Sequence, residues 1–130
     1  RLVYMNHDLG VFPDIRWAAK KYPTLTFMGG HFHPALNELA GKVPNLRDCT
    51  CAALNPDAVG DEVKRRGRSR TLLVGSDFGL FCLAFGVGMV AYADIAEADK
   101  QNILGLNAVR LLKRTKWFKP SMLMCTKQGR

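Results

Sequence analysis

The feature that most constrains this chain is the segment Thr71–Phe78, which reads Thr-Leu-Leu-Val-Gly-Ser-Asp-Phe. Its apolar and β-branched residues predict a strand buried on both faces, which ends in the carboxylate of Asp77. In parallel α/β folds, the carboxyl ends of the strands hold the side chains that do chemistry. Two earlier apolar runs also end in an ionisable residue, His7 and His31. We therefore expect His7, His31 and Asp77 to converge at one rim of a parallel sheet.

Helical segments separate these apolar runs. Prolines in a first helical turn predict helices that begin near Phe12 and at Pro34 and Pro56, and Gly67 is a typical helix end. A third strand is expected over Leu46–Leu54. Strands that alternate with helices, without hairpin signals, predict a parallel sheet with right-handed crossovers. Four such β-α units are too few for a (β/α)₈ barrel, so we expect half of a barrel or a small open α/β domain.

The segment after Asp77 is apolar and rich in glycine. Phe78–Ala93 carries no charge but falls short of the ~20 residues that a membrane-spanning helix needs, so a loop and a buried helix are expected. A further helix is expected over Asp94–Leu104, where Gly105 breaks it. Asn107 is then expected to cap a last short helix.

Length and charge support one globular domain. The chain has 130 residues, 48% of them hydrophobic, and a net charge of +8. Residues 113–130 contain six Lys or Arg and no acid, which leaves +2 for the remainder. We predict a domain over residues 1–113 and a basic tail over 114–130. A solvated tail explains this local excess of positive charge better than nucleic-acid binding does. A start at Arg1 rather than Met suggests a processed or partial chain.

The cysteines favour a reducing compartment. Cys49, Cys51, Cys82 and Cys125 show no C-x-x-C spacing, and the first two would share one face of a strand. Free thiols are therefore expected rather than a disulfide framework. With no signal peptide visible, a cytoplasmic location is expected.

Five short motifs occur in an order that resembles a known family. They are His7-Asp8-Leu9-Gly10, Lys20-Lys21-Tyr22-Pro23-Thr24-Leu25, Gly30-His31, Gly75-Ser76-Asp77-Phe78, and Ile103–Ala108 with Leu111-Leu112. This order resembles the C-terminal half of the amidohydrolase superfamily, in the amidohydrolase-2 group that includes aminocarboxymuconate-semialdehyde decarboxylase. The resemblance implies the C-terminal half of a (β/α)₈ TIM barrel. The family's first-strand His-x-His has no counterpart, Phe78-Gly79 replaces a common Phe-Pro, and the tail has no match.

The resemblance also implies a site. His7 and Asp77 would be ligands of a divalent metal, usually zinc, and Asp77 would accept a proton from bound water. His31 would steady developing negative charge. The implied activity is that of a metal-dependent hydrolase or decarboxylase for a small carboxylated or cyclic substrate, incomplete without the first four strands.

The residues next to this site have open interpretations. His33 lies past its strand beside Pro34, where it would contact substrate or simply be exposed. Phe78 would contact substrate, and with Phe81, Phe85, Met89 and Tyr92 it would line an apolar pocket, belong to the core or meet another subunit. Without the resemblance, a cap for the next helix would be a more common role for Asp77 than catalysis.

Two functions of other classes remain as alternatives. The runner-up is a non-catalytic half-barrel fragment that self-associates, since a sheet of four units exposes two edges and an apolar lumen face. A homo-oligomer or a complementary half-barrel would then cover these surfaces. Nucleic-acid binding by the basic tail is the third and least favoured alternative, and no membrane partner is expected.

Overall fold

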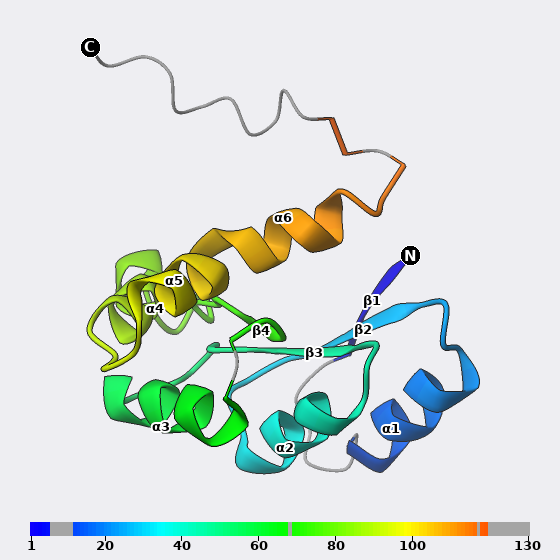
Figure 1. Cartoon of the computed structure of the whole chain (residues 1–130), viewed down its shortest axis with the longest axis horizontal. Helices are drawn as coiled ribbons and strands as arrows, with labels where there is room; N and C mark the ends of the chain where they lie inside the picture. The colour runs from blue at the N-terminus through cyan, green and yellow to red at the C-terminus, as the bar shows by residue number, and fades with distance from the viewer. Residues whose placement is uncertain (6–11, 68, 117, 120–130) are drawn as a thin grey trace.

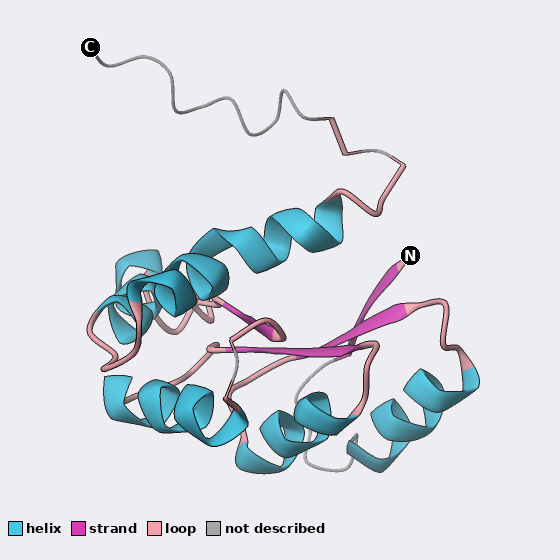
Figure 2. Cartoon of the chain, viewed as in Figure 1, coloured by secondary structure: helices cyan, strands magenta, loops and turns pink. Residues whose placement is uncertain are grey.

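The structure, a computed structural model, describes residues 1–5, 12–67, 69–116, 118 and 119. In chain order the elements are β1 (Leu2–Met5), α1 (Phe12–Lys21), β2 (Thr26–Gly29), α2 (Pro34–Lys42), β3 (Leu46–Cys49), α3 (Pro56–Arg66), β4 (Leu72–Leu73), α4 (Leu83–Ala91), α5 (Glu97–Gln101), the π-helix η2 (Asn102–Leu106) and α6 (Asn107–Leu112). Strands and helices alternate through the first part of the chain (Figure 2). The strands form one parallel sheet in the order β1-β2-β3-β4, which confirms the predicted succession of β-α units.

The helices divide into two groups around this sheet. Helices α1, α2 and α3 lie side by side below the sheet in the view of Figure 1, whereas α4, α5 and α6 gather near β4. The alternation of side chains along each strand explains the first group, because one face of β1, β2 and β3 carries the apolar residues that meet α1 and α2. Among the described residues, no helix is both long enough and apolar enough to cross a bilayer.

Two apolar clusters build the core. The first joins α1 and α2 to β2 and β3, and its buried members are Ile15, Ala19, Phe27, Leu36, Ala40, Val43 and Leu46. The second joins α3 and α4 to β4 and η2, and its buried members are Ala53, Val59, Val63, Leu72, Val90, Ala93 and Ile103. Burying these side chains supplies the main driving force for folding.

A buried ionic network lies between β3 and α3. Asp48 is fully buried, and the guanidinium of Arg66 contacts the carboxylate of Asp48 and that of Glu62. Arg66 also donates to Thr71 Oγ1 at 2.8 Å. In the amide orientation that satisfies both groups, Asn37 Nδ2 donates to Asp48 Oδ2 at 3.0 Å. Burial raises the pKa of Asp48 to about 6, although Arg66 acts in the opposite direction.

The chain after β4 differs from the sequence-based expectation. Gly105 does not end a helix, and Asn107 is not a cap. Instead η2 continues into α6, and Asn107 is a buried helix residue whose Nδ2 donates to Ser69 O at 2.8 Å and Leu72 O at 2.7 Å. Val74 N also donates to Ile103 O at 3.1 Å. These bonds tie the helical segment to β4, which explains why the glycine does not break it.

The same bonds correct the expectation of two exposed sheet edges. In a parallel sheet, each strand turns alternate backbone groups toward its two neighbours. Thr71 O accepts from Asp48 N and Leu73 O accepts from Thr50 N, so Leu72 O and Val74 N face the other edge. Since Asn107 and Ile103 bind these groups, part of the β4 edge is already covered. The sheet edge at β1 has no such cover among the described residues.

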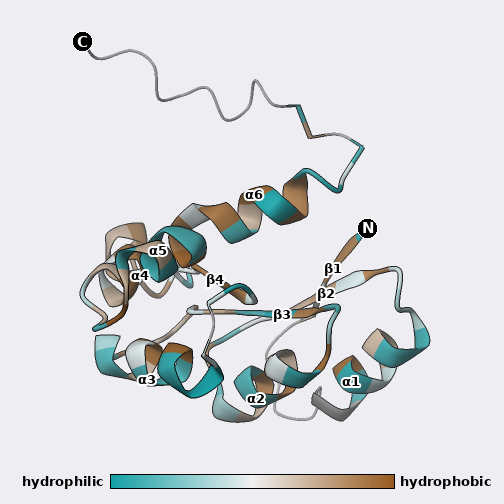
Figure 3. Cartoon of the chain, viewed as in Figure 1, coloured by the Kyte–Doolittle hydropathy of each residue, from teal (hydrophilic) through white to brown (hydrophobic). Residues whose placement is uncertain are grey.

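The glycines of α4 explain how closely this helix approaches the end of β4. A Cβ on Gly86 would lie 2.7 Å from Gly75 O and 2.8 Å from Ser76 Cα, whereas a Cβ on Gly88 would meet nothing within 4 Å. Figure 3 shows that α4 is largely apolar, unlike the mixed surfaces of α1, α2 and α3. Gly86 therefore lets an apolar helix pack directly against the Gly-Ser-Asp segment.

Candidate metal centre

Three neighbouring loops bring ionisable side chains together at the carboxyl end of the sheet. His31 follows β2, Cys51 follows β3, and Asp77 follows β4. Because the strands are parallel, these loops lie at the same edge of the sheet. They are also bound to one another, since Phe32 N donates to Cys51 O at 2.7 Å and Gly75 N donates to Thr50 Oγ1 at 3.2 Å. The site thus rests on a hydrogen-bonded set of loops.

The backbone at these loops adopts an uncommon conformation. His31, Ala52 and Asp77 have φ values of 62°, 58° and 55°, in the left-handed region that L-residues other than glycine rarely occupy. This conformation costs about 1–2 kcal/mol per residue. Such strain is concentrated at functional sites, where it fixes the direction of a side chain. Two of the three strained residues carry the side chains of the candidate site.

The side-chain atoms converge closely. His31 Nε2 lies 3.4 Å from Asp77 Oδ2, and the side chains are 27% and 22% exposed. One ligand atom from each of His31, Cys51 and Asp77 lies within 4.8 Å of the other two. Among the described residues, Asp77 Oδ2 is buried and finds no hydrogen-bond partner. An imidazole, a thiol and a carboxylate around an unsatisfied buried oxygen form a donor set that fits a divalent transition metal.

The Cys51 thiol responds to this environment. Burial raises the pKa of Cys51, and the neighbouring Asp77 carboxylate raises it further through a hydrogen bond and its negative charge. Burial also raises the pKa of Cys49 to about 12. Cys49, Cys51 and Cys82 are free thiols as predicted, and Cys125 lies outside the described residues.

The structure brings together two of the predicted site residues. His31 and Asp77 meet as the strand-end pattern predicted. His7 lies outside the described residues, so its place at the rim stays a prediction. His33 is the N-cap that precedes α2, and its Nδ1 accepts a hydrogen bond from Ala35 N at 3.2 Å. Phe78 is 88% exposed beside Asp77.

Cys51 is the residue that sequence reasoning missed as part of the site. Leu46–Leu54 was expected to be a continuous strand with Cys51 as a structural thiol, but β3 ends at Cys49. Ala52 has a positive φ and Ala53 N bonds back to Thr50 O at 2.9 Å, so the chain turns there. The usable signal was one of position, because Cys51 follows the third strand just as His31 and Asp77 follow theirs, although β3 reads Leu-Arg-Asp-Cys and is not an apolar run.

The apolar residues around Asp77 have divided roles. Phe81 and Phe85 stack with ring centroids 4.7 Å apart, and Met89 packs against the second apolar cluster. Phe78 and Tyr92, by contrast, are 88% and 83% exposed. Met89 therefore belongs to the core, whereas Phe78 and Tyr92 lie at the surface.

Comparison with known proteins identifies the fold. No protein-family model and no curated protein matches the sequence. An uncharacterized TIM-barrel protein from Bordetella bronchiseptica superposes with a TM-score of 0.70 over 86% of this chain and 45% of its own, at 22% identity. A 2,6-dihydroxybenzoate decarboxylase from Rhizobium gives a TM-score of 0.59 at 19% identity, over 73% of this chain and 36% of its own.

Two further decarboxylases superpose in the same way. A dihydroxybenzoic acid decarboxylase from Polaromonas sp. JS666, with bound manganese and 2-nitroresorcinol, gives a TM-score of 0.57 at 18% identity, over 77% of this chain and 38% of its own. The 5-carboxyvanillate decarboxylase LigW from Sphingomonas paucimobilis gives 0.56 at 18% identity, over 75% and 36%. This chain spans less than half of each structure. Its fold is therefore four successive β-α units of the TIM barrel found in these decarboxylases.

Proposed function

We propose that this chain supplies one part of the catalytic centre of a metal-dependent decarboxylase or hydrolase of the amidohydrolase type. The substrate would be a small carboxylated or cyclic molecule. One observation carries the proposal: Asp77 Oδ2 is buried beside His31 Nε2 and the Cys51 thiol, and within the described part of the chain it has no hydrogen-bond partner. A buried carboxylate oxygen without a partner is costly, and a cation removes that cost.

The decarboxylase hypothesis is supported by the functions of the structures that share the fold. Three of the barrels described above act on hydroxylated or methoxylated aromatic acids, and one of them binds manganese. The exposed ring of Phe78 next to Asp77 offers an apolar surface for an aromatic substrate. Hydrolysis of a cyclic substrate uses the same residues and stays the alternative within this proposal.

Each residue has a role that its position allows. Asp77 and His7 would hold the metal, and a bound divalent cation would polarise the substrate's oxygen atoms. His31, whose Nε2 points at Asp77, would donate a hydrogen bond to negative charge that develops on the substrate. In hydrolysis Asp77 would take up a proton from water, whereas in decarboxylation His31 would return a proton to carbon. His33, the N-cap of α2, and Phe78 would contact the substrate.

Cys51 bears on which cation binds. Zinc is the metal that the sequence resemblance implies, whereas one structural neighbour holds manganese. Thiolate ligands favour zinc, while manganese prefers oxygen ligands. If Cys51 joins Asp77 as a ligand, we expect zinc to bind more tightly than manganese. A Cys51→Ser variant would reduce this preference.

Metal analysis combined with an activity assay tests the proposal. We expect the chain dialysed against zinc or manganese to retain near-stoichiometric metal by elemental analysis, and Asp77→Asn to lose it. The matched control is Asp61→Asn, because Asp61 is an exposed carboxylate on α3. Release of CO₂ from 2,6-dihydroxybenzoate and 5-carboxyvanillate would then report decarboxylation. Equal metal retention by wild type and Asp77→Asn would contradict the proposed centre.

The second candidate is a non-catalytic fragment that self-associates. The observation in its favour is the β1 edge, where Leu2 and Tyr4 are 43% and 56% exposed. An exposed strand edge readily pairs with another chain. Sedimentation analysis at several concentrations distinguishes the two functions when it is combined with the metal assay. An oligomer without bound metal would favour this second candidate.

A further inference from the structure

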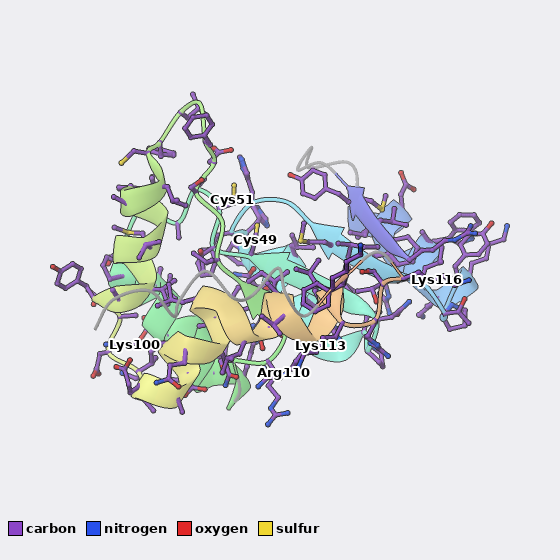
Figure 4. The ribbon with its side chains drawn as sticks, turned by 90° about the horizontal axis from the view of Figure 1, so that it is seen from above. Cys49, Cys51, Lys100, Arg110, Lys113 and Lys116 are labelled. Carbon is purple, nitrogen blue, oxygen red and sulfur yellow. The ribbon has the colours of Figure 1, made fainter. Side chains whose placement is uncertain are left out.

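A second concave site lies at the other end of β3 and β4. Arg47 is the second residue of β3 and Arg70 precedes β4, whereas the metal centre follows the ends of the strands. The cavity has a volume of about 320 Å³ and is lined by Arg47, Arg70, Asn107, Arg110, Leu111 and Arg114. Figure 4 shows Arg110 and Lys113 along α6, on the side of the molecule away from Cys51. We call this site the arginine cleft.

Uncharged groups hold two of the four guanidinium groups in place. Arg110 donates to Asn107 Oδ1 at 2.7 Å and to Asn102 Oδ1 at 2.8 Å. Asn107 is itself fixed by its bonds to Ser69 O and Leu72 O. Arg47 donates to Pro44 O at 2.9 Å and to Leu46 O at 2.7 Å. These bonds orient the two side chains toward the cavity that they line.

No carboxylate is found among the residues that line the arginine cleft. In the part of the chain that the structure describes, no side-chain hydrogen bond or ion pair is found for Arg70 or for Arg114, whose backbone N donates to Leu111 O at 3.1 Å. Residues 100–130 contain eight Lys or Arg and no Asp or Glu, so the whole net charge of +8 comes from this segment. Four guanidinium groups around one cavity repel one another, and an anion placed among them is strongly attracted.

We propose that the arginine cleft binds a phosphorylated small molecule through a phosphoryl or diphosphate group. Arginine forms paired hydrogen bonds with phosphate oxygens, and a phosphate offers three such acceptors to guanidinium groups that arrive from different elements. A carboxylate offers only two oxygens. The described lining residues include no aromatic ring, which disfavours single-stranded nucleic acid because its bases need stacking partners. This site is separate from the metal centre and does not depend on the proposed activity.

Calorimetric titration with pyrophosphate tests this proposal. The full chain is titrated at about 0.15 M salt, where exposed charges are largely screened, in buffer that contains EDTA. We expect saturable binding that weakens about 100-fold in the double variant Arg70→Gln/Arg114→Gln. The matched control is Lys20→Gln/Lys42→Gln, which removes the same charge from the groove between α1 and α2. This control and Asp77→Asn should bind within about twofold of wild type.

Three results would overturn the proposal. They are the absence of saturable pyrophosphate binding, equal weakening in the two double variants, and binding of a single-stranded oligonucleotide that pyrophosphate does not displace. Since Arg70 and Arg114 are exposed, both variants should keep the unfolding midpoint of wild type. Should the double variant fail to fold, Arg114→Lys keeps the charge but loses the paired hydrogen bonds, and we expect it to weaken binding several-fold. Unchanged binding there would also contradict the proposal.

Discussion

The two sides of the sheet are stabilised in different ways. Around β1 and β2, the strands are stabilised mainly by a long register of paired residues and by an apolar cluster, and the outer edge of β1 is open among the described residues. Around β3 and β4, only two residues of each strand pair. There, the network of Asp48, Arg66 and Glu62 and the bonds from Asn107 hold the strands. The comparison shows that a strand of two residues keeps its place when side chains bind its edge and its start.

The largest effect should follow from breaking the ionic network on the β3–β4 side. Arg66→Met leaves two carboxylates, Asp48 and Glu62, buried without their shared cation. We expect a loss of about 3–5 kcal/mol in the free energy of unfolding, measured with urea. The neighbouring Arg65→Met is the control, because Arg65 is half exposed and its pair with Glu62 is worth at most about 1 kcal/mol. Similar losses in both variants would contradict the proposed importance of the network.

The pH dependence of stability should differ between the two sides. Burial raises the pKa of Asp48 from 3.8 to about 6, so between these values the folded chain holds a proton that the unfolded chain has released. The contribution of this group to stability is therefore greatest below about pH 4 and falls as the pH rises through 6.

Comparing wild type with Asp48→Asn isolates the contribution that the ionisation of Asp48 makes to stability. The difference between their free energies of unfolding should change by roughly 3 kcal/mol between pH 4 and pH 7. Wild type should become less stable relative to Asp48→Asn as the pH rises. Leu36→Ala in the first apolar cluster should cost about 2–4 kcal/mol at every pH, because no charge is involved. A parallel response of wild type and Asp48→Asn to pH would exclude Asp48 as the cause.

Removing the side chain that covers the β4 edge should have the next largest effect. Asn107→Ala leaves Ser69 O and Leu72 O without the donor that now satisfies them. We expect a loss of about 2–3 kcal/mol in urea unfolding. Asn102→Ala removes a single longer bond to Ser69 Oγ, at 3.2 Å, and the contact with Arg110, so it should cost about 1 kcal/mol. The reverse order would show that the edge bonds matter less than we infer.

The smallest effect is expected from a methyl group between α4 and β4. Gly86→Ala places a Cβ against the backbone of Gly75 and Ser76, which we expect to cost about 1–3 kcal/mol and to displace Asp77. Gly88→Ala in the same helix meets open space and should stabilise by up to about 1 kcal/mol through helix propensity. Thermal unfolding and metal retention measure both effects. A Gly86→Ala variant as stable as Gly88→Ala would refute the close contact.

The sequence predicted the repeating elements better than their ends. Proline at Pro34 and Pro56 and glycine at Gly67 mark helix boundaries through local backbone chemistry, and the structure confirms them. The short lengths of β3 and β4 were not predictable, because the residues after them look apolar but turn through left-handed positions such as Ala52. The tie between Asn107 and β4 joins residues 35 positions apart, which periodicity does not detect.

The candidate site was predictable to the extent that it follows from strand ends. His31 and Asp77 follow apolar runs, and a parallel sheet brings such positions together. Cys51 was assigned to a strand interior, so its side chain was not placed at the rim. The division into a domain over 1–113 and a tail over 114–130 stays a prediction, as do the places of His7 and of the substrate.

The bonds between η2, α6 and β4 have a consequence for how this sheet could be extended. A strand that arrived beside β1 would find backbone groups ready to pair, so growth on that side would be simple addition. A strand that arrived beside β4 would first have to displace the Asn107 amide from Leu72 O and the Ile103 carbonyl from Val74 N. Closing the sheet into a barrel would therefore require existing hydrogen bonds to be exchanged at the β4 edge but not at the β1 edge. Extension of the sheet thus has a preferred direction.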